Sequence, residues 1–318
     1  MSNSSQVGLS TQTSSNWVGF FHLLVVYIVW GSTYLAIRVA VREGSGFPPF
    51  TMGAMRLALA GCILLLGAYL FKQTLKLTRE ELKILALSGI FLWVGGNGLV
   101  MWAEQFADSG YAALLVGTTP MWVALMEGIL DRKSPTKLLV FSLLVGFVGI
   151  GLLTVPAFKE SSHADVLSII ALLTAAISWG IGSLLLRRKQ VSINPFVSSG
   201  YQQVFGCIGF AILALLMNEP NPNPNTEAWW AFGYLVVFGS LLAFTSYLMA
   251  LKLLPTSIVM TYAYVNPVVA VFLGWLILGE TISIWIIAGT ALVLFGVAGA
   301  FQNQKVKAQE HKAGNLKD

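Results

Sequence analysis

The stretch AEQFADSGYAALLVGTTP, residues 103–120, aligns without gaps on ALKLLPTSIVMTYAYVNP, residues 250–267, an offset of 147 residues. Two further pairs of motifs recur in the same order, at offsets of 149 and 146 residues: Trp30-Gly31 with Trp179-Gly180, and Pro49-Phe50 with Pro195-Phe196. A nearly constant offset in matching order indicates an internal repeat. The chain is therefore predicted to consist of two related halves.

The composition places the chain in a membrane. Hydrophobic residues make up 56% of 318 positions and charged residues only 10%, with a mean hydropathy of +0.74. Soluble domains keep roughly a quarter of their residues charged. The net charge of +5 does not indicate nucleic-acid binding, because the basic residues lie in short loops between apolar runs. Cys62 and Cys207 lie inside apolar runs and predict no disulfide or metal site.

Ten apolar windows of about twenty residues predict an all-α membrane protein with ten transmembrane helices. The expected spans are 17–37, 50–71, 83–102, 107–130 and 137–155, then 165–186, 196–217, 228–250, 255–278 and 283–301. The domain prediction is a first five-helix repeat over 17–155 and a second over 165–301. Residues 1–16, which contain no basic residue, are expected to be a disordered tail rather than a cleaved signal. Residues 302–318 are expected to be a disordered basic tail.

The distribution of basic residues predicts the orientation. With the N-terminus in the cytoplasm, the cytoplasmic loops and tail carry fifteen Lys and Arg residues, and the opposite side carries three. Positive residues concentrate on the cytoplasmic side of membrane proteins, so both termini are predicted to be cytoplasmic. Because five is odd, the second half would enter the membrane inverted. Inverted repeats are typical of secondary transporters, although a duplication can also simply build a stable bundle.

Four longer motifs resemble the EamA family of the drug/metabolite transporter superfamily, in particular its YedA-like group of bacterial inner-membrane transporters. They are YIVWGSTYLAIR (27–38), VGGNGLVMWAEQ (94–105), AAISWGIGS (175–183) and TYAYVNPVVAVFLG followed by LGET (261–281). The resemblance implies a ten-helix transporter in which the first four helices of each half surround a central pathway. It also implies an exporter or facilitator of amino acids or other small metabolites, most often in the bacterial inner membrane.

Arg56 is the one Lys or Arg in the interior of a predicted span, away from its ends. A central Arg costs about 2.5–3.5 kcal/mol to insert, and its permanent charge requires a cavity, a carboxylate or carbonyl groups. We expect either a ligand for a substrate carboxylate or a structural tie to backbone carbonyls. Gln202, its partner in the repeat, is the expected neutral counterpart across the pathway.

Asn97 and Glu104 lie seven residues apart and therefore share one face of the third span. Both are candidate pathway residues. Glu104 could gate the pathway, bind a cationic amine or take up a proton. The alternative is a carboxylate at the membrane edge that reaches into headgroup water.

Pro120 and Pro267 occupy equivalent positions in the fourth and ninth spans. A proline inside a helix removes one hydrogen bond and kinks the helix, and the freed carbonyl can serve as a polar site. Asn266, Tyr262 and Tyr264 next to Pro267 are further candidates. A kink without ligand contact is the alternative.

Trp30 and Trp179 head the paired Trp-Gly motifs and can stack on a substrate; packing alone is the other interpretation. Ser32 and Tyr34 on the first span are expected hydrogen-bonding liners. No catalytic or metal-ligating cluster, cofactor motif or nucleotide-binding loop is found in the sequence. A small-molecule substrate and the lipid bilayer are the expected partners, and an enzyme, a channel or a non-transport membrane protein are the alternatives.

Overall fold

The computed structural model describes residues 6–132, 136–160, 163–189, 191–254, 256–259 and 261–314. Every secondary-structure element in these ranges is a helix, which confirms the all-α prediction. The elements of the first half are α1 (Gln6–Val41), α2 (Pro49–Leu70), α3 (Arg79–Gly89), η1 (Ile90–Gly98), α4 (Leu99–Ala103), α5 (Ser109–Val116), α6 (Thr119–Leu130) and α7 (Lys137–Glu160). Those of the second half are α8 (His163–Arg188), α9 (Pro195–Leu216), α10 (Thr226–Tyr234), η2 (Leu235–Ala243), α11 (Phe244–Leu253), α12 (Thr256–Val259), α13 (Tyr262–Leu273), η3 (Gly274–Leu278) and α14 (Ile284–Gly314).

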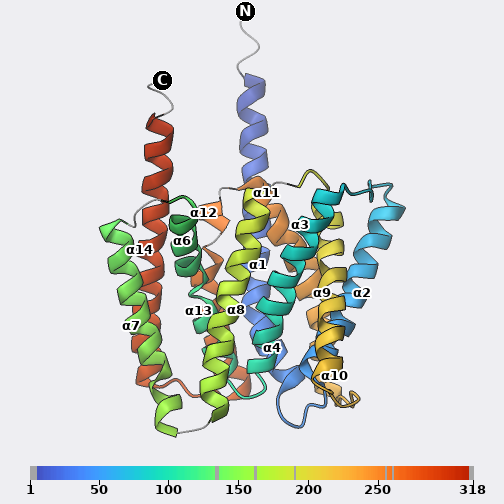
Figure 1. The fold of residues 1–318 in the computed structure, drawn as a ribbon, viewed down its shortest axis with the longest axis vertical. Coiled ribbons are helices and arrows are strands. Elements are labelled where there is room, and N and C mark those ends of the chain that lie inside the picture. Colours follow the sequence, from blue (N-terminus) through green and yellow to red (C-terminus); the bar gives the residue numbers. More distant parts are fainter. Residues whose placement is uncertain are drawn as a thin grey trace, which may run out of the picture.

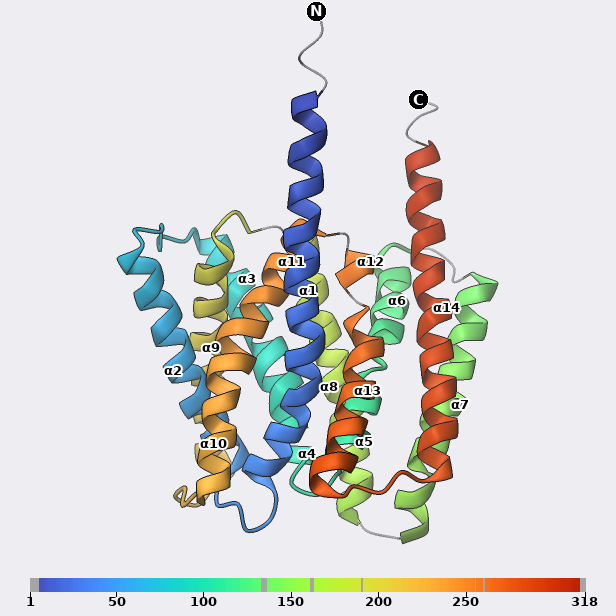
Figure 2. The ribbon, with the colours of Figure 1, turned by 180° about the vertical axis from the view of Figure 1, so that it is seen from behind.

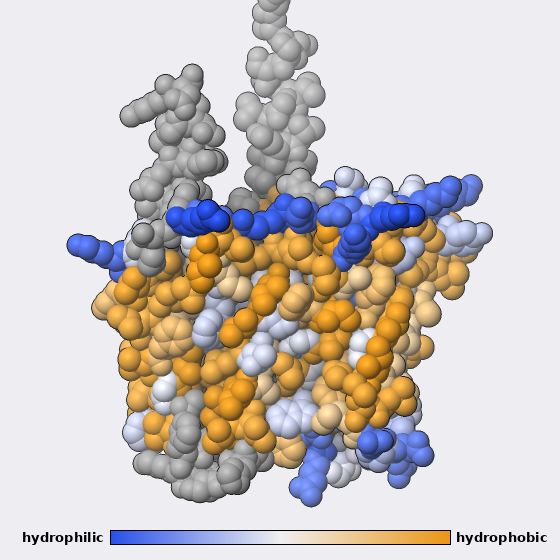
Figure 3. Space-filling model, viewed as in Figure 1, coloured by the Kyte–Doolittle hydropathy of each residue, from blue (hydrophilic) through white to orange (hydrophobic). Residues whose placement is uncertain are grey.

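The helices form a bundle with an apolar belt between two polar ends (Figure 3). Seven helical segments among the described residues are long and apolar enough to cross a membrane, and three more apolar segments are shorter: Lys137–Leu153, Val265–Leu278 and Ile284–Gly299. The chain is therefore a multi-pass membrane protein. The count of ten spans and the cytoplasmic side of the termini stay predictions.

Equivalent helices of the two halves pack in an antiparallel, pairwise manner. α2 packs against α9 and α7 against α14, and the members of each pair run in opposite directions (Figures 1 and 2). The packing of α8 on η1 is likewise matched by that of α1 on η2. Each contact thus has its counterpart when the halves are exchanged, as an inverted repeat requires.

Local backbone features also recur between the halves. η1 and η2 are π-helical segments of nine residues each, at corresponding places in the third span and the eighth. Lys72 and Asn218, which follow α2 and α9, both adopt left-handed backbone conformations with φ of 55° and 49°. This conformation is common just after a helix C-terminus. The repeat therefore extends to turn geometry that residue types alone do not reveal.

The wide turns of η1 and η2 leave backbone carbonyls that side chains satisfy. The Ser178 hydroxyl donates to the Phe91 carbonyl at 2.8 Å, and Gln203 Nε2 donates to the Ser240 carbonyl at 3.1 Å. π-helical segments often occur at functional sites. Here both lie at mid-bundle and flank the cavity described below.

Parts of both expected tails are helical in the described residues, and residues 1–5 and 315–318 lie outside them. α1 already begins at Gln6 and α14 continues to Gly314, and both extend beyond the same end of the bundle (Figure 2). No proline interrupts 6–16 or 302–314, and the second stretch is rich in Lys, Gln, Glu and Ala. The residues of the second stretch favour helix, so α14 continues past the apolar belt.

Candidate functional site

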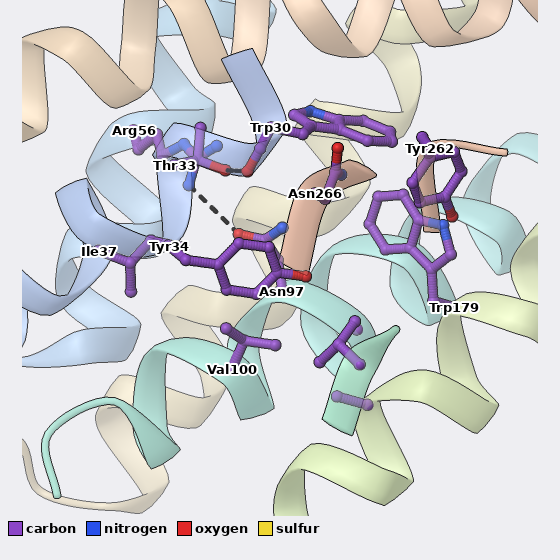
Figure 4. A pocket seen from close by; sticks show the side chains of 13 residues that line it. Trp30, Thr33, Tyr34, Ile37, Arg56, Asn97, Val100, Trp179, Tyr262 and Asn266 are labelled. Atoms are coloured by element: carbon purple, nitrogen blue, oxygen red, sulfur yellow. Dashed lines mark hydrogen bonds between the residues drawn. The ribbon is translucent and has the colours of Figure 1, made fainter. Parts of the chain in front are cut away.

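A cavity of about 50 Å³ lies in the middle of the bundle, with room for a few water molecules. Residues from both halves surround it (Figure 4). They are Trp30, Thr33, Tyr34, Ile37, Arg56, Gly96, Asn97, Val100, Val116, Ala175, Trp179, Tyr262 and Asn266. The structure thus brings together seven of the predicted pathway residues: Trp30, Tyr34, Arg56, Asn97, Trp179, Tyr262 and Asn266.

Arg56 supplies the positive charge of the cavity. Its side chain is 2% exposed; Nε donates to Ser240 Oγ at 2.7 Å, and Nη1 donates to Asn97 Oδ1 at 3.2 Å. The guanidinium carbon lies 5.3 Å from the centre of the Trp93 ring, within cation–π range. Both hydrogen bonds go to neutral side chains, and no carboxylate pairs with Arg56 among the described residues. An anionic group entering the cavity would therefore meet an uncompensated cation.

Aromatic side chains form the opposite wall. The Trp30 ring meets the rings of Trp179 and Tyr262 edge-on, at centroid distances of 5.2 and 5.4 Å. Tyr247 of α11, which sequence reasoning did not single out, lies 4.9 Å from Trp30. Such edge-to-face contacts hold large rings in fixed positions. The two tryptophans of the repeated motif meet across the centre of the molecule.

Asn266 provides a second polar group. Its side chain is 4% exposed, and Oδ1 has no hydrogen-bond partner among the described residues. A buried carbonyl oxygen without a partner costs free energy, and a donor on a bound molecule would remove that cost. The cavity thus combines a cation, a free acceptor and an aromatic wall (Figure 4).

Of the predicted pathway residues with described side chains, Gln202, Ser32 and Glu104 do not line the cavity. Gln202 is buried between α9 and α3, where its Nε2 donates to Ser88 Oγ at 3.0 Å, so it does not face Arg56 across the cavity. The Ser32 hydroxyl bonds to the Tyr234 hydroxyl at 2.6 Å, on the outer face of α1. Successive residues of a helix point in different directions, so Thr33 and Tyr34 face inward where Ser32 does not. The side chain of Tyr264 lies outside the described residues.

The Glu104 carboxyl does not reach into water at the end of its span. It lies just after α4, is completely buried, and does not line the cavity. Arg38 Nη1 donates to its backbone carbonyl at 2.5 Å. The protein interior covers this carboxyl because α1 closes over the end of α4.

The two prolines behave differently from each other. Pro120 sits in the first turn of α6, just after a break between α5 and α6, so no interior hydrogen bond is lost. A proline fits the first turn because its missing N–H would have no helical partner there. Pro267 lies inside α13 as predicted. The two regions meet at the centre, since a Cβ on Gly117 would lie 3.0 Å from Pro267 Cγ.

Ion pairs at the two ends of the bundle were mostly missed by sequence reasoning. Arg187 pairs with Glu127 between α8 and α6, and Arg188 pairs with Asp131 at 2.5 Å beside them. At the other end, Arg42 pairs with Glu227 at 2.9 Å between α1 and α10. Pairing across helices depends on which loops meet, and a single sequence carries no signal for that.

The remaining lining residues also escaped prediction. Ile37, Gly96, Val100, Val116 and Ala175 are apolar or small and resemble any other helix residue. Ser240, the partner of Arg56, is a polar residue inside an apolar run, and that was the available signal.

Comparison with known proteins agrees with this architecture. The model of the EamA-like transporter family matches the chain twice, over residues 17–155 and 166–302. The uncharacterized inner membrane transporter YedA of Escherichia coli is 32% identical over 266 residues, covering 83% of this chain and 84% of that protein. The uncharacterized transporter YoaV of Bacillus subtilis is 22% identical, with 86% and 94% covered. One solved crystal structure superposes with a TM-score of 0.62 at 20% identity, covering 91% of this chain and 97% of that one, and has the same fold.

Proposed function

Because this chain belongs to the EamA-like transporter family, we propose that it exports small metabolites such as amino acids by alternating access. The chain is a membrane transporter; the substrate class, the direction and the mechanism are the proposal. We place it in the bacterial inner membrane with both termini in the cytoplasm, on the side where basic residues concentrate.

The observation that carries the proposal is the central cavity. Arg56 offers a charged donor suited to a carboxylate, and Asn266 offers a free acceptor suited to an ammonium group. The wall of Trp30, Trp179 and Tyr262 suits an apolar side chain. An amino acid carries all three features.

The antiparallel pairing of the halves supports the mechanism. When equivalent helices pack about a central site, each half can adopt the conformation of the other, which opens the site to the opposite face. The cavity volume of about 50 Å³ is smaller than typical ligand pockets of about 300–1,000 Å³. Binding of an amino acid therefore requires the cavity to widen, which the proposed movement of the halves apart would provide.

Counterflow in proteoliposomes tests the proposal. Purified full-length protein is reconstituted into vesicles preloaded with one unlabelled amino acid, and entry of the same labelled amino acid is followed for a panel. We expect transient, saturable accumulation of at least one member. Flux that does not saturate and shows no counterflow would indicate a channel, and absence of any flux across the panel would contradict amino-acid transport.

A further inference from the structure

Glu104 is a buried acid that does not line the central cavity. Its side chain is fully buried, and neither carboxyl oxygen has a hydrogen-bond partner among the described residues. An ionised carboxylate in such a place is costly unless it is paired and hydrogen-bonded. A protonated carboxyl tolerates the site far better, so the geometry as it stands fits the neutral form.

The charged and titratable groups around Glu104 do not neutralise its carboxylate. From α1, Arg38 directs Nη1 to the backbone carbonyl of Glu104 rather than to the carboxyl oxygens. From the loop before α14, the Glu280 carboxylate accepts hydrogen bonds from the backbone N–H groups of Ser109 and Gly110 at 2.8 and 3.0 Å. Glu280 also accepts from the Ser109 hydroxyl at 2.7 Å, so both of its carboxyl oxygens already have hydrogen-bond donors.

The other helices around Glu104 bring no further cation to it among the described side chains. Arg56 of α2 lies at the cavity, and Arg187 and Arg188 lie at the far end of α8. Asp108, four residues after Glu104, is a second acid near Arg38 and Glu280. Tyr34 of α1 approaches Glu104 from the cavity side. Burial, together with the nearby Glu280 charge, raises the pKa of Glu104 well above its ordinary value, and Arg38 opposes that rise.

We propose that Glu104 binds and releases a proton during each transport cycle, and that this proton drives substrate movement. This inference rests on the proposed transport function and names its energy source. When the proton leaves, the carboxylate requires a cation, and Arg38 is the cation within reach. Arg38 then moves from the carbonyl to the carboxylate.

Helix α1 connects the proposed proton-binding site to the substrate cavity. α1 carries Arg38 and also the cavity residues Thr33, Tyr34 and Ile37. Tyr34 lies one helical turn from Arg38, so both residues face the same side of α1. A change in the Arg38 contact therefore shifts the helix that lines the cavity. α4, which ends just before Glu104, lies toward the end of the bundle opposite to the extensions of α1 and α14 (Figure 1). The proton therefore exchanges with the compartment on that side when that end opens.

The transport experiment compares wild type with Glu104→Gln, a neutral mimic of the protonated acid, in proteoliposomes. The probe is the amino acid that gives the strongest counterflow. In wild type, a gradient of one pH unit should sustain up to about a tenfold substrate ratio for one proton per substrate. Glu104→Gln should keep counterflow, which needs no gradient, and lose the pH-driven ratio. Glu227→Gln removes an exposed carboxylate at the same end of the bundle and is the matched control, expected to behave like wild type.

The outcomes separate the two proposals. Counterflow in wild type without any pH-driven ratio would overturn proton coupling and leave transport intact. A pH-driven ratio that persists in Glu104→Gln would remove Glu104 from the role. No counterflow for any amino acid would contradict the proposed function and, with it, this inference.

A second measurement does not depend on substrate. Infrared difference spectra of the purified protein between acid and alkaline pH should contain the carbonyl band of a protonated carboxyl that titrates above the range of exposed acids. The band should be absent in Glu104→Gln and present in Glu227→Gln. If it is unchanged in Glu104→Gln, Glu104 is not the proton-binding group.

Discussion

Arg38 and Arg187 occupy equivalent positions eight residues after the tryptophans of the repeated motif, yet they have different partners at opposite ends of the molecule. Arg187 pairs with the carboxylate of Glu127, whereas Arg38 bonds to a backbone carbonyl and leaves the carboxyl of Glu104 without a partner. The position equivalent to Glu127, at the offset of 147, is Gly274, and the Glu280 carboxylate occupies the space where a side chain there would lie. Duplication thus preserved the backbone and the arginines but divided the acids unequally between the two ends.

One end is therefore held by an ion pair, whereas the other contains a carboxyl group proposed to gain and lose a proton. Between the ends lies the one buried arginine of the cavity, Arg56. The roles assigned to these three arginines can be separated by substitution.

The largest effect is expected at the centre. Arg56→Ala removes two charge-assisted hydrogen bonds and the cation that would meet a carboxylate. One charge-assisted hydrogen bond to a substrate carboxylate contributes about 1.5–3 kcal/mol, so loss of that bond should lower substrate affinity in counterflow by roughly 10- to 100-fold. Arg42→Ala, which changes an arginine outside the cavity, is the control. Full transport by a normally expressed Arg56→Ala protein would exclude a ligand role.

The next effect concerns the paired end. Arg187→Ala leaves the Glu127 carboxylate, which is 14% exposed, without its cation. The free energy of unfolding should fall by about 1–3 kcal/mol, measured by thermal unfolding in detergent. The double variant Arg187→Ala/Glu127→Ala should recover part of that loss, because no unpaired charge remains. If the loss in the double variant equals the sum of the losses in the two single variants, the ion pair makes no contribution of its own to the free energy of unfolding.

A pH-dependent effect is expected at the unpaired end. Because the pKa of Glu104 is raised in the folded protein, the folded state binds this proton more tightly than the unfolded state does. The stability from that proton is present below the unfolded pKa and is lost as pH rises through the folded pKa. Unfolding temperatures measured against pH should therefore decline less steeply for Glu104→Gln than for wild type. Parallel curves for the two proteins would indicate that Glu104 stays ionised.

The smallest effect is expected for the exposed pair at the same end as Glu104. Arg42 and Glu227 are 38% and 68% exposed, and exposed ion pairs contribute about 0.2–1 kcal/mol. Arg42→Ala should lower the free energy of unfolding by no more than this, and the change should shrink in high salt. A loss as large as that of Arg187→Ala would mean that both ends are held equally.

Much of the architecture could be predicted because apolar length and repeat offsets are properties of the sequence itself. The predicted spans are mostly helical in the described residues, although 107–130 and 255–278 are each broken into more than one helix, and Trp30, Arg56 and Asn266 do meet in one cavity. Gln202 was placed wrongly because a repeat fixes backbone equivalence and not the neighbours of a side chain. The burial of Glu104 depends on how α1 covers the end of α4, and the contact is between residues 66 positions apart. Such contacts leave no local signal.

The π-helical segment η1 has one further consequence. η1 lies between α3, in which Ser88 contacts Gln202, and α4. The cavity residue Asn97 lies in the last turn of η1. An α-helix rotates by about 100° per residue and a π-helix, with its i→i+5 hydrogen bonds, by less. Replacing η1 by continuous α-helix would therefore rotate everything after it relative to α3. Asn97 and Glu104 would then both point away from their present surroundings. The π-helical geometry of η1 therefore determines the directions in which the side chains of Asn97 and Glu104 point.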